Sequence, residues 1–121
     1  MQIAQKNFYK KLLGRVGEKK AAEFLKEKGY KILETNHKTH LGEIDIIAED
    51  GEYVVFVEVK TRSGDAFGQP SEAVDRKKQE KYFRVATEYL QRKGKLDAPS
   101  RFDVIEIENG QINHINDAFS M

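Results

Sequence analysis

YVVFVEVK, residues 53–60, is the most apolar run of the chain, and it carries two charges toward its end. Its β-branched and aromatic residues are typical of a buried strand. Glu58 and Lys60 belong to this strand, although an uncompensated charge is costly to bury. Two explanations are open: Glu58 and Lys60 form a structural ion pair, or the strand carries them to a place where charge is needed.

The length and composition of the chain limit its class. The chain has 121 residues, of which 39% are hydrophobic and none is cysteine, and its net charge is +1. This size suits a single domain over residues 1–121. We expect no membrane segment and no secretory signal, because no apolar run has the required length or flanks. The absence of cysteine excludes disulfides and favours a cytoplasmic location.

The near-neutral net charge hides an uneven distribution. Residues 1–20 and 76–95 are strongly basic, and residues 21–75 between them are acidic. The simplest interpretation is that the basic segments are solvated helix faces. The alternative is that they bind a polyanion while the acidic segment holds a cation.

Hydrophobic periodicity predicts the order helix, three strands, helix, two strands. The dipeptides Asp50-Gly51 and Asn109-Gly110 predict two hairpins, and Asp75 is a suitable N-cap for the second helix. The result is an α/β domain with a sheet covered by helices. The predicted elements are helices over residues 8–28 and 75–93 and strands over residues 30–35, 43–49, 52–60, 101–108 and 111–115.

The first hairpin gathers several charged residues on one face. With a two-residue loop at residues 50–51, Glu43 lies opposite Glu58, and Asp45 is diagonal to Glu58 within roughly 7–8 Å. Because side chains alternate along a strand, Glu43, Asp45 and Glu58 share a face, and Lys60 lies on it too. Carboxylates this close repel one another, and a divalent cation relieves that repulsion.

This cluster suits metal-assisted phosphodiester hydrolysis. Asp45, Glu58 and the main-chain carbonyl of Val59 offer the oxygen ligands that Mg²⁺ or Mn²⁺ takes, with water completing the shell. Lys60 can neutralise a phosphate oxygen or hold an attacking water, while the metal polarises the phosphate. The sequence therefore predicts a catalytic metal site at the end of this strand.

Two helix residues are candidates for the same site. Glu18 lies at the flank of the first helix's apolar face, so it either points toward Asp45 and Glu58 or is a surface glutamate beside its neighbouring lysines. Gln79 lies on the apolar face of the second helix, and a position on the rim of the site is the favoured interpretation.

Other polar residues are weaker candidates. Each basic side chain alone is most simply a solvated one, but together they suit phosphate contacts. His37 and His40 are interpreted as loop histidines, and Asp103 as a strand-edge aspartate. The candidates for phosphate contacts are Thr61, Arg62, Lys77, Lys78, Lys81 and Arg84, and those for support of the site are Glu43, Thr61 and Gln79.

Three segments carry a family resemblance. GRVGEKKAAEFLKEKGYKILETN (residues 14–36), LGEIDIIAEDGEYVVFVEVKTR (41–62) and GQPSEAV (68–74) resemble the YraN-type endonuclease-like family. That family is similar to archaeal Holliday-junction resolvases and to the wider PD-(D/E)XK nuclease superfamily. The resemblance implies a mixed central sheet flanked by helices, in the order αβββαβ. This restriction-endonuclease-like core would span residues 8–108, with residues 111–118 as an added edge strand.

The resemblance also implies roles for individual residues. The superfamily's metal-binding acids fall on Asp45 and Glu58, its catalytic lysine on Lys60 and its helix glutamate on Glu18. Ile44 stands where the superfamily has proline. Gln79-x-x-Tyr82 is similar to a Q-x-x-Y pattern found in some branches.

Three functions remain open from the sequence. The first is a Mg²⁺- or Mn²⁺-dependent nuclease acting on DNA, with selectivity for branched or junction DNA as one form of it. The second is a nucleic-acid-binding module on the same fold that does not cleave. The third is a protein-interaction domain in which the acid cluster is a relic. A homodimer is expected by analogy with the resolvases.

Overall fold

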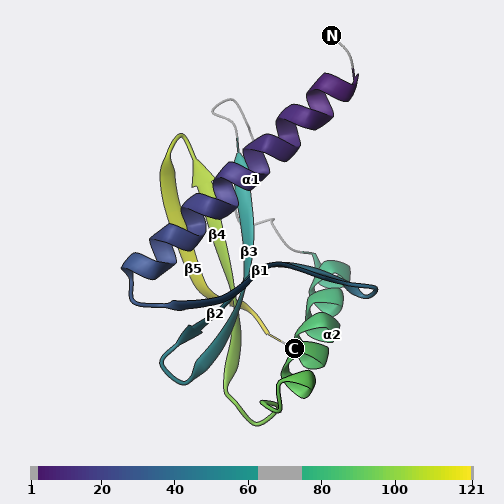
Figure 1. The fold of residues 1–121 in the computed structure, drawn as a ribbon, viewed down its shortest axis with the longest axis vertical. Coiled ribbons are helices and arrows are strands. Elements are labelled where there is room, and N and C mark those ends of the chain that lie inside the picture. The colour runs from purple at the N-terminus through teal and green to yellow at the C-terminus, as the bar shows by residue number, and fades with distance from the viewer. Residues whose placement is uncertain (1–2, 63–74, 121) are drawn as a thin grey trace.

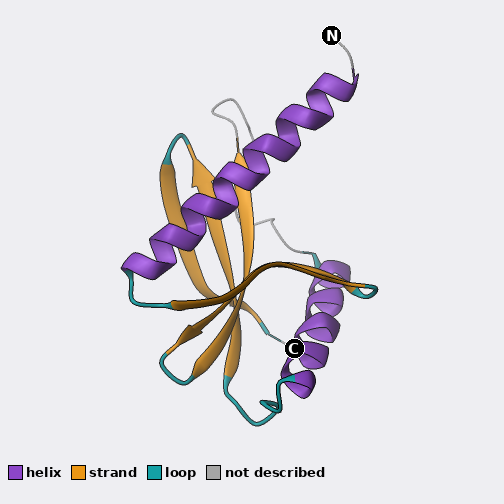
Figure 2. Ribbon diagram, in the orientation of Figure 1, coloured by secondary structure: helices purple, strands orange, loops and turns teal. Residues whose placement is uncertain are grey.

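The computed structural model of the chain describes residues 3–62 and 75–120. Its five strands form one sheet whose spatial order, β1-β2-β3-β4-β5, follows the chain. Helix α1 crosses one face and helix α2 packs on the other (Figures 1 and 2). The elements are α1 (Ile3–Glu27), β1 (Lys31–Thr39), β2 (Gly42–Asp50), β3 (Tyr53–Arg62), α2 (Arg76–Arg92), β4 (Ser100–Glu108) and β5 (Gln111–Phe119).

The sheet is mixed, as predicted. Strands β3 and β4 pair in parallel, and α2 connects them, whereas the other neighbouring pairs are antiparallel. A parallel pair needs such a crossover because its two strands run in the same direction. The predicted order αβββαβ with an added edge strand is therefore confirmed. Among the described helices, none combines the length and apolar character needed to cross a membrane.

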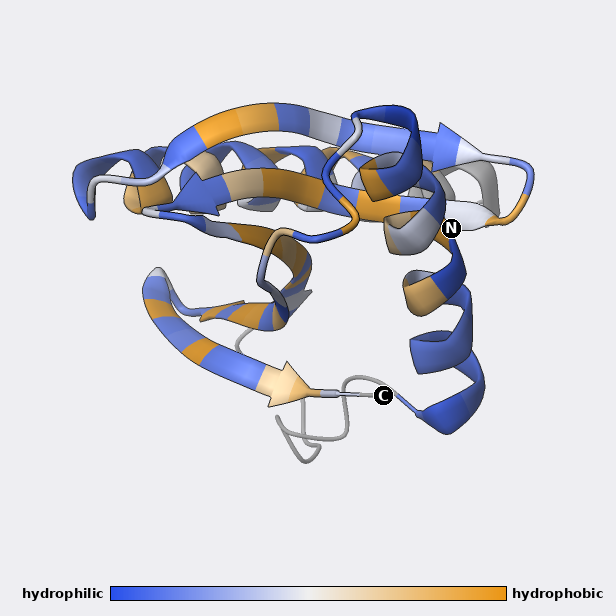
Figure 3. Cartoon of the chain, turned by 90° about the horizontal axis from the view of Figure 1, so that it is seen from below, coloured by the Kyte–Doolittle hydropathy of each residue, from blue (hydrophilic) through white to orange (hydrophobic). Residues whose placement is uncertain are grey.

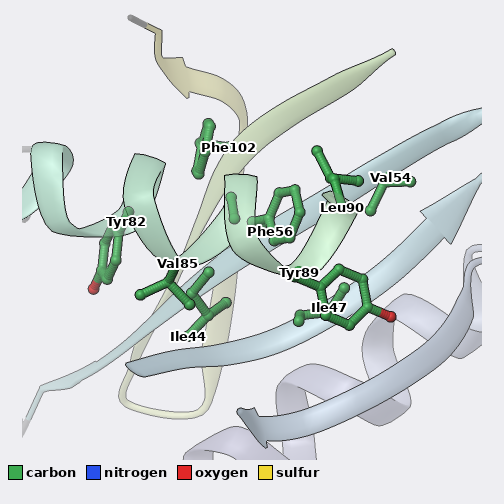
Figure 4. Close-up of a cluster of buried hydrophobic side chains, with 10 residues drawn as sticks. Ile44, Ile47, Val54, Phe56, Tyr82, Val85, Tyr89, Leu90 and Phe102 are labelled. Carbon is green, nitrogen blue, oxygen red and sulfur yellow. The ribbon is translucent and has the colours of Figure 1, made fainter. Parts of the chain in front are cut away.

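Each face of the sheet has its own hydrophobic core. On one face, Ala21 and Leu25 of α1 pack against the odd-numbered valines of β3 and against Ile46 of β2. On the other, Tyr82, Val85 and Tyr89 of α2 cover the even-numbered side chains of β3 and Ile47 of β2 (Figure 4). The interior strand β3 is therefore apolar on both sides, while the edge strand β5 mixes hydrophobic and hydrophilic residues (Figure 3).

Helix α1 approaches β3 most closely at Gly17. This glycine is buried, and a Cβ atom added to it would lie 2.0 Å from Thr61 Oγ1 and 3.2 Å from Thr61 Cβ. Such distances are below van der Waals contact, so only glycine permits this approach. The contact fixes how near the middle of α1 lies to the end of β3.

The β2–β3 hairpin corrects the predicted register. Asp50 pairs with Tyr53, so the two loop residues are Gly51 and Glu52, and Gly51 adopts a φ of +60°. A loop at residues 50–51 was wrong because Gly51, which accepts a positive φ, occupies the first loop position. The pairing moves by two residues, an even number, so the paired residues 46–50 and 53–57 keep their predicted faces. Ile44 packs with Ile47 and not with Ile46, so the alternation of β2 is interrupted just before the paired segment.

The new register brings the acids closer than predicted. The observed ladder ends with Ile46 opposite Val57. Asp45 and Glu58 are the next residue on each strand, and their side chains interact directly. The predicted pairing of Glu43 with Glu58 was wrong for the same reason as the loop. A direct cross-strand pair is closer than a diagonal one.

Strand β1 is longer than predicted, and this changes the place of His37. The strand continues to Thr39 because residues 37–39 pair with β2, with Lys38 opposite Glu43. His37 is buried, and its ring meets the Tyr89 ring edge-on at 5.3 Å between centroids. The interpretation of His37 as a loop residue was wrong, since polar residues form a strand where a partner strand supplies hydrogen bonds.

Asp103 also differs from its prediction. It lies in β4, an interior strand, and is fully buried on the side covered by α1. His114 Nε2 lies 2.8 Å and Arg101 Nε 3.0 Å from its carboxylate, which also accepts the main-chain N–H of Asp117 at 2.9 Å. Burial raises the pKa of Asp103, but these donors outweigh it and hold the pKa below its usual value.

Candidate functional site

The predicted acids lie where β2 and β3 separate. Beyond the last paired residues the strands diverge, and Asp45 Oδ2 accepts the main-chain N–H of Val59 at 2.8 Å. A buried N–H without a strand partner must be satisfied in another way. Asp45 therefore completes the backbone hydrogen bonding of β3 and places its carboxylate beside Glu58.

A polar cleft of about 590 Å³ opens at this point. Four elements contribute to it: α1, β2, β3 and the first turns of α2. The cleft thus lies at one end of the sheet, between the two helix layers. Its lining residues are Glu18, Gly42, Glu43, Asp45, Glu58, Val59, Asp75, Lys77, Lys78, Lys81 and Tyr82.

Glu58 is held from three directions. Its Oε2 lies 3.1 Å from Lys78 Nζ and 3.7 Å from Lys60 Nζ, and its Oε1 accepts the hydroxyl of Tyr82. The carboxylate is thus buried, oriented and paired with two ammonium groups. The predicted Glu58–Lys60 ion pair is present; Glu58 lines the cleft, whereas Lys60 lies beside Glu58 and is not among the lining residues.

The electrostatics of the cleft are dominated by the two adjacent acids. Burial and the negative charge of Glu58 raise the pKa of Asp45 to about 8, against the opposing effect of the Val59 N–H. Burial and the neighbouring Lys78 lower the pKa of Lys60. Burial opposes the charge of Lys78, but Glu58 outweighs it and the pKa of Lys78 is raised. Asp45 forms no ion pair within residues 3–62 and 75–120, although its charge contributes to the raised pKa of Lys78, while Glu58 pairs with two ammonium groups.

The donor set fits a magnesium- or manganese-type ion. Asp45 and Glu58 supply adjacent carboxylates, and Val59 lines the cleft with its main chain directed at Asp45. Within residues 3–62 and 75–120, no three acidic or histidine side chains converge closely enough to hold a metal alone. Mg²⁺ needs no such cage, since it commonly takes one or two carboxylates and completes its shell with water and phosphate oxygens. The uncompensated charge at Asp45 is where such an ion would be stabilised.

Most predicted site residues meet at the cleft. Glu18, for which two positions were open, lines it from α1, and its charge contributes to the raised pKa of Asp45. Glu43 lines it from β2, as do Lys77, Lys78 and Lys81 from α2. Their predicted roles toward metal and phosphate stay predictions.

The remaining candidates lie elsewhere. Thr61 packs against Gly17 beneath α1, and Arg62 lines a separate cleft at the ends of β3 and β4. Gln79 is half-buried on α2 but does not line the cleft of Asp45, which agrees with a position near its rim. Arg84 is exposed and is also absent from the lining residues. We therefore expect these four to contribute less than the lining lysines.

Sequence reasoning missed the contact of Tyr82 and Lys78 with Glu58. Periodicity assigned Tyr82 to the apolar face of α2, which is correct for its ring, but its hydroxyl points out of the hydrophobic cluster (Figure 4). Lys78 and Tyr82 are four residues apart, so they share a helix face. The four-residue spacing of Lys78 and Tyr82, close to the N-cap Asp75, could have indicated that this face of α2 becomes polar at its N-terminal end.

The fold and the cleft together define a small α/β protein, compatible with a restriction-endonuclease-like core, whose acids and lysines gather at the point where two strands diverge. The chain belongs to the uncharacterised protein family UPF0102, whose sequence profile matches residues 17–107. The resemblance to the YraN-type family is thereby confirmed. The matched range contains Glu18, Asp45, Glu58 and Lys60.

Relatives of similar length share about half of the sequence. A UPF0102 protein of Alkaliphilus metalliredigens is 48% identical over 112 residues, which cover 90% of this chain and 98% of the relative. One from Alkaliphilus oremlandii is 52% identical over 115 residues, with the same coverage. One from Caldanaerobacter subterraneus subsp. tengcongensis is 47% identical over 121 residues, covering 94% of this chain and 99% of the relative.

Proposed function

We propose that the protein is a Mg²⁺- or Mn²⁺-dependent nuclease that hydrolyses phosphodiester bonds in DNA. The observation that supports this most directly is the adjacent pair Asp45 and Glu58, in which burial and the charge of Glu58 raise the pKa of Asp45 to about 8. Buried acids with strongly shifted pKa values in a cleft are typical of functional sites. If Asp45 and Glu58 served only the structure, we would expect each carboxylate to have a cationic partner.

The residues in and beside the cleft would have separate roles in such a reaction. Asp45, Glu58 and the carbonyl of Val59 would hold the ion, which supplies polarisation of the phosphate and an activated water. Lys60 lies beside Glu58 with a lowered pKa, so its amine is placed to hold a phosphate oxygen or a water. Tyr82 orients Glu58 through its hydroxyl. Glu18 is placed to accept a hydrogen bond from a water in the same cleft.

The wall of α2 suits a phosphate backbone. Lys77, Lys78 and Lys81 line one side of the cleft, and each can contact a phosphate without reading sequence. A neighbouring helix N-terminus, capped by Asp75, adds a partial positive charge. The cleft therefore combines anion-binding groups with a cation-binding pair a short distance away.

A cleavage panel tests the proposal. Linear duplex, single-stranded, flap and four-way-junction DNA are incubated with Mg²⁺, Mn²⁺ or EDTA and with wild type, Asp45→Asn, Lys60→Ala and Arg92→Ala. We expect metal-dependent cutting that falls at least about 100-fold in the first two variants, since each removes a group acting at the transition state. Arg92→Ala is the control, because Arg92 is exposed at the far end of α2 and outside the cleft. The panel also shows which DNA form is preferred.

Asp45→Asn is chosen over alanine because the amide oxygen still accepts the N–H of Val59. Mn²⁺ binding measured by calorimetry gives a readout that does not depend on cleavage. Unchanged Mn²⁺ affinity in Asp45→Asn, or cutting that persists in EDTA, would contradict the assignment. The homodimer expected from the resemblance stays a prediction, and light scattering of the same sample tests it.

The second candidate is a nucleic-acid-binding module without catalysis. The observation that favours it is the ion pair between Lys78 and Glu58, because the Lys78 ammonium already contacts one carboxylate oxygen of Glu58, a proposed metal ligand. Under this function, DNA binding falls steeply with salt but is indifferent to EDTA and to Asp45→Asn. Binding of that kind, with no cutting of any DNA form in the panel, would favour the module over the nuclease.

A further inference from the structure

A second cleft lies at the ends of β3, β4 and β5. It measures about 450 Å³ and is lined by polar side chains, chiefly Arg62, Glu106, Glu108, Gln111 and Asn113. This volume is within the usual range for small-molecule sites. The charges of Arg62 and of the two glutamates are mixed, so the cleft favours neither a simple cation nor a simple anion.

Glu106 distinguishes this cleft from an ordinary polar surface. Its side chain is buried, with 5% of the residue exposed, and its Oε2 accepts no hydrogen bond from any residue in the described ranges. Its Oε1 accepts one long hydrogen bond, 3.3 Å, from the Nδ2 of Asn113, which is itself exposed. A buried acceptor without a donor is unfavourable by the full cost of its desolvation. Glu106 is therefore ready to accept N–H donors if the Asn113 amide turns aside.

The position of Glu106 relates this cleft to the first one. Lys60 and Glu106 are register partners in the parallel pair β3–β4, so their side chains lie on the same face of the sheet. Neighbouring strands are about 4.8 Å apart. A phosphate held at Lys60 thus has Glu106 on the adjacent strand, within the reach of one nucleotide.

The donor pattern indicates which groups fit. A carboxylate accepts hydrogen bonds but offers none, so it suits an edge that presents N–H groups. Cytosine and adenine each present an amino group on the pairing edge, and guanine presents neighbouring N–H and amino donors there. Thymine has no amino group, and its one N–H lies between two carbonyl oxygens, which a carboxylate repels. These edges are accessible only in unpaired bases, which proteins commonly recognise by their pairing edges.

We propose that the cleft at Glu106 binds an unpaired base with an exocyclic amino group (cytosine, adenine or guanine, but not thymine) next to the phosphate held at Lys60. The proposal rests on the proposed function in taking nucleic acid as the substrate. It adds a substrate class to it, namely DNA with at least one unpaired nucleotide at the cutting site. Glu106 selects the base, and Asn113 occupies the carboxylate when the base is absent.

Binding of short oligonucleotides tests this without cleavage. Fluorescein-labelled octamers of deoxycytidine and of thymidine, equal in charge and length, are titrated with the protein in EDTA and followed by anisotropy. We expect the cytosine octamer to bind about tenfold more tightly than the thymine octamer. Glu106→Gln keeps the side-chain volume but changes one acceptor to a donor, so the ratio should fall to about one.

Glu52→Gln is the matched control, because it makes the same change of charge at an exposed residue of the β2–β3 turn, outside both clefts. Its ratio should stay near tenfold. An equal fall of the cytosine-to-thymine affinity ratio in both variants would mean that charge alone sets the preference, and it would overturn the proposal. A ratio of one in wild type would also overturn it.

A third variant covers a failure of Glu106→Gln to fold, which circular dichroism detects. Asn113→Ala removes the competing amide from an exposed position and should raise the ratio above that of wild type. An unchanged or lower ratio in this variant would overturn the proposal. The octamer titration and the cleavage panel together separate the proposed base site from the proposed nuclease activity. Cutting without base preference refutes only the base site at Glu106. Base preference without cutting refutes only the nuclease activity.

Discussion

Asp45 and Asp103 are both aspartates on interior strands of one sheet, yet their surroundings are opposite. Asp103 is fully buried with hydrogen bonds from His114, Arg101 and a main-chain N–H, and its pKa is lowered. Asp45 is only half-buried, has one main-chain donor and faces Glu58, and its pKa is raised to about 8. Burial alone therefore does not indicate a site, whereas burial with unbalanced charge does.

The largest expected effect concerns the compensated aspartate. Asp103→Ala leaves Arg101 and His114 without their shared acceptor, and we expect it to lower the free energy of unfolding by about 3–5 kcal/mol in urea denaturation at pH 7. Asp97→Ala is the control, because Asp97 is exposed. A loss below about 1 kcal/mol in Asp103→Ala would show that the network contributes little.

The pH dependence of this effect follows from the direction of the pKa shift. The pKa of Asp103 is lower in the folded protein than in the unfolded chain. Its stabilisation is therefore complete above about pH 4, the unfolded pKa, and is lost as the pH falls through the folded pKa. The difference between wild type and Asp103→Asn should shrink correspondingly in acid.

The uncompensated aspartate should behave in the opposite way. The unfolded chain releases the proton of Asp45 near pH 4, while the folded protein keeps it up to about pH 8. Wild type is therefore penalised increasingly between these values. In EDTA, we expect Asp45→Asn to raise the free energy of unfolding by about 2 kcal/mol at pH 8, with a smaller gain at pH 5. A variant less stable than wild type at pH 8 would remove the contrast with Asp103.

The smallest effect concerns the group that orients Glu58. Tyr82→Phe keeps the ring in the core but removes the hydroxyl that Glu58 accepts. We expect a loss of about 1–2 kcal/mol in stability and weakening of Mn²⁺ binding by about tenfold. Tyr89→Phe is the matched control on the same helix, away from Glu58. Equal Mn²⁺ affinities in the two variants would show that Tyr82 does not orient a metal ligand.

The elements were predictable because their signals are local. Asn109 and Gly110 both adopt positive φ, so that hairpin formed where the sequence placed it. At the first hairpin only Gly51 does so, and the turn lies one residue later than predicted. Asp45 and Glu58 still line one cleft, although the alternation of β2 is interrupted beside Asp45, where Ile44 packs with Ile47.

The parts that were missed depend on contacts between distant segments. The bond from Tyr82 to Glu58 requires the docking of α2 on the sheet, and periodicity reports only that the Tyr82 ring is buried. The network of Asp103 requires the pairing of β4 with β5, which brings His114 and Asp117 to it. A short sequence window contains neither contact.

Gly17, which has no side chain, constrains the cleft through its neighbour. Any larger residue at this position would push α1 away from Thr61, and rotating the Thr61 hydroxyl would relieve only part of the overlap because Thr61 Cβ is also close. Glu18 is the next residue and would move out of the cleft with the helix. In a search for altered specificity, a substitution at position 17 would therefore change the geometry of the acidic cluster without replacing any of its acidic residues. It shows that the spacing of two layers, as much as the choice of functional groups, is encoded in this sequence.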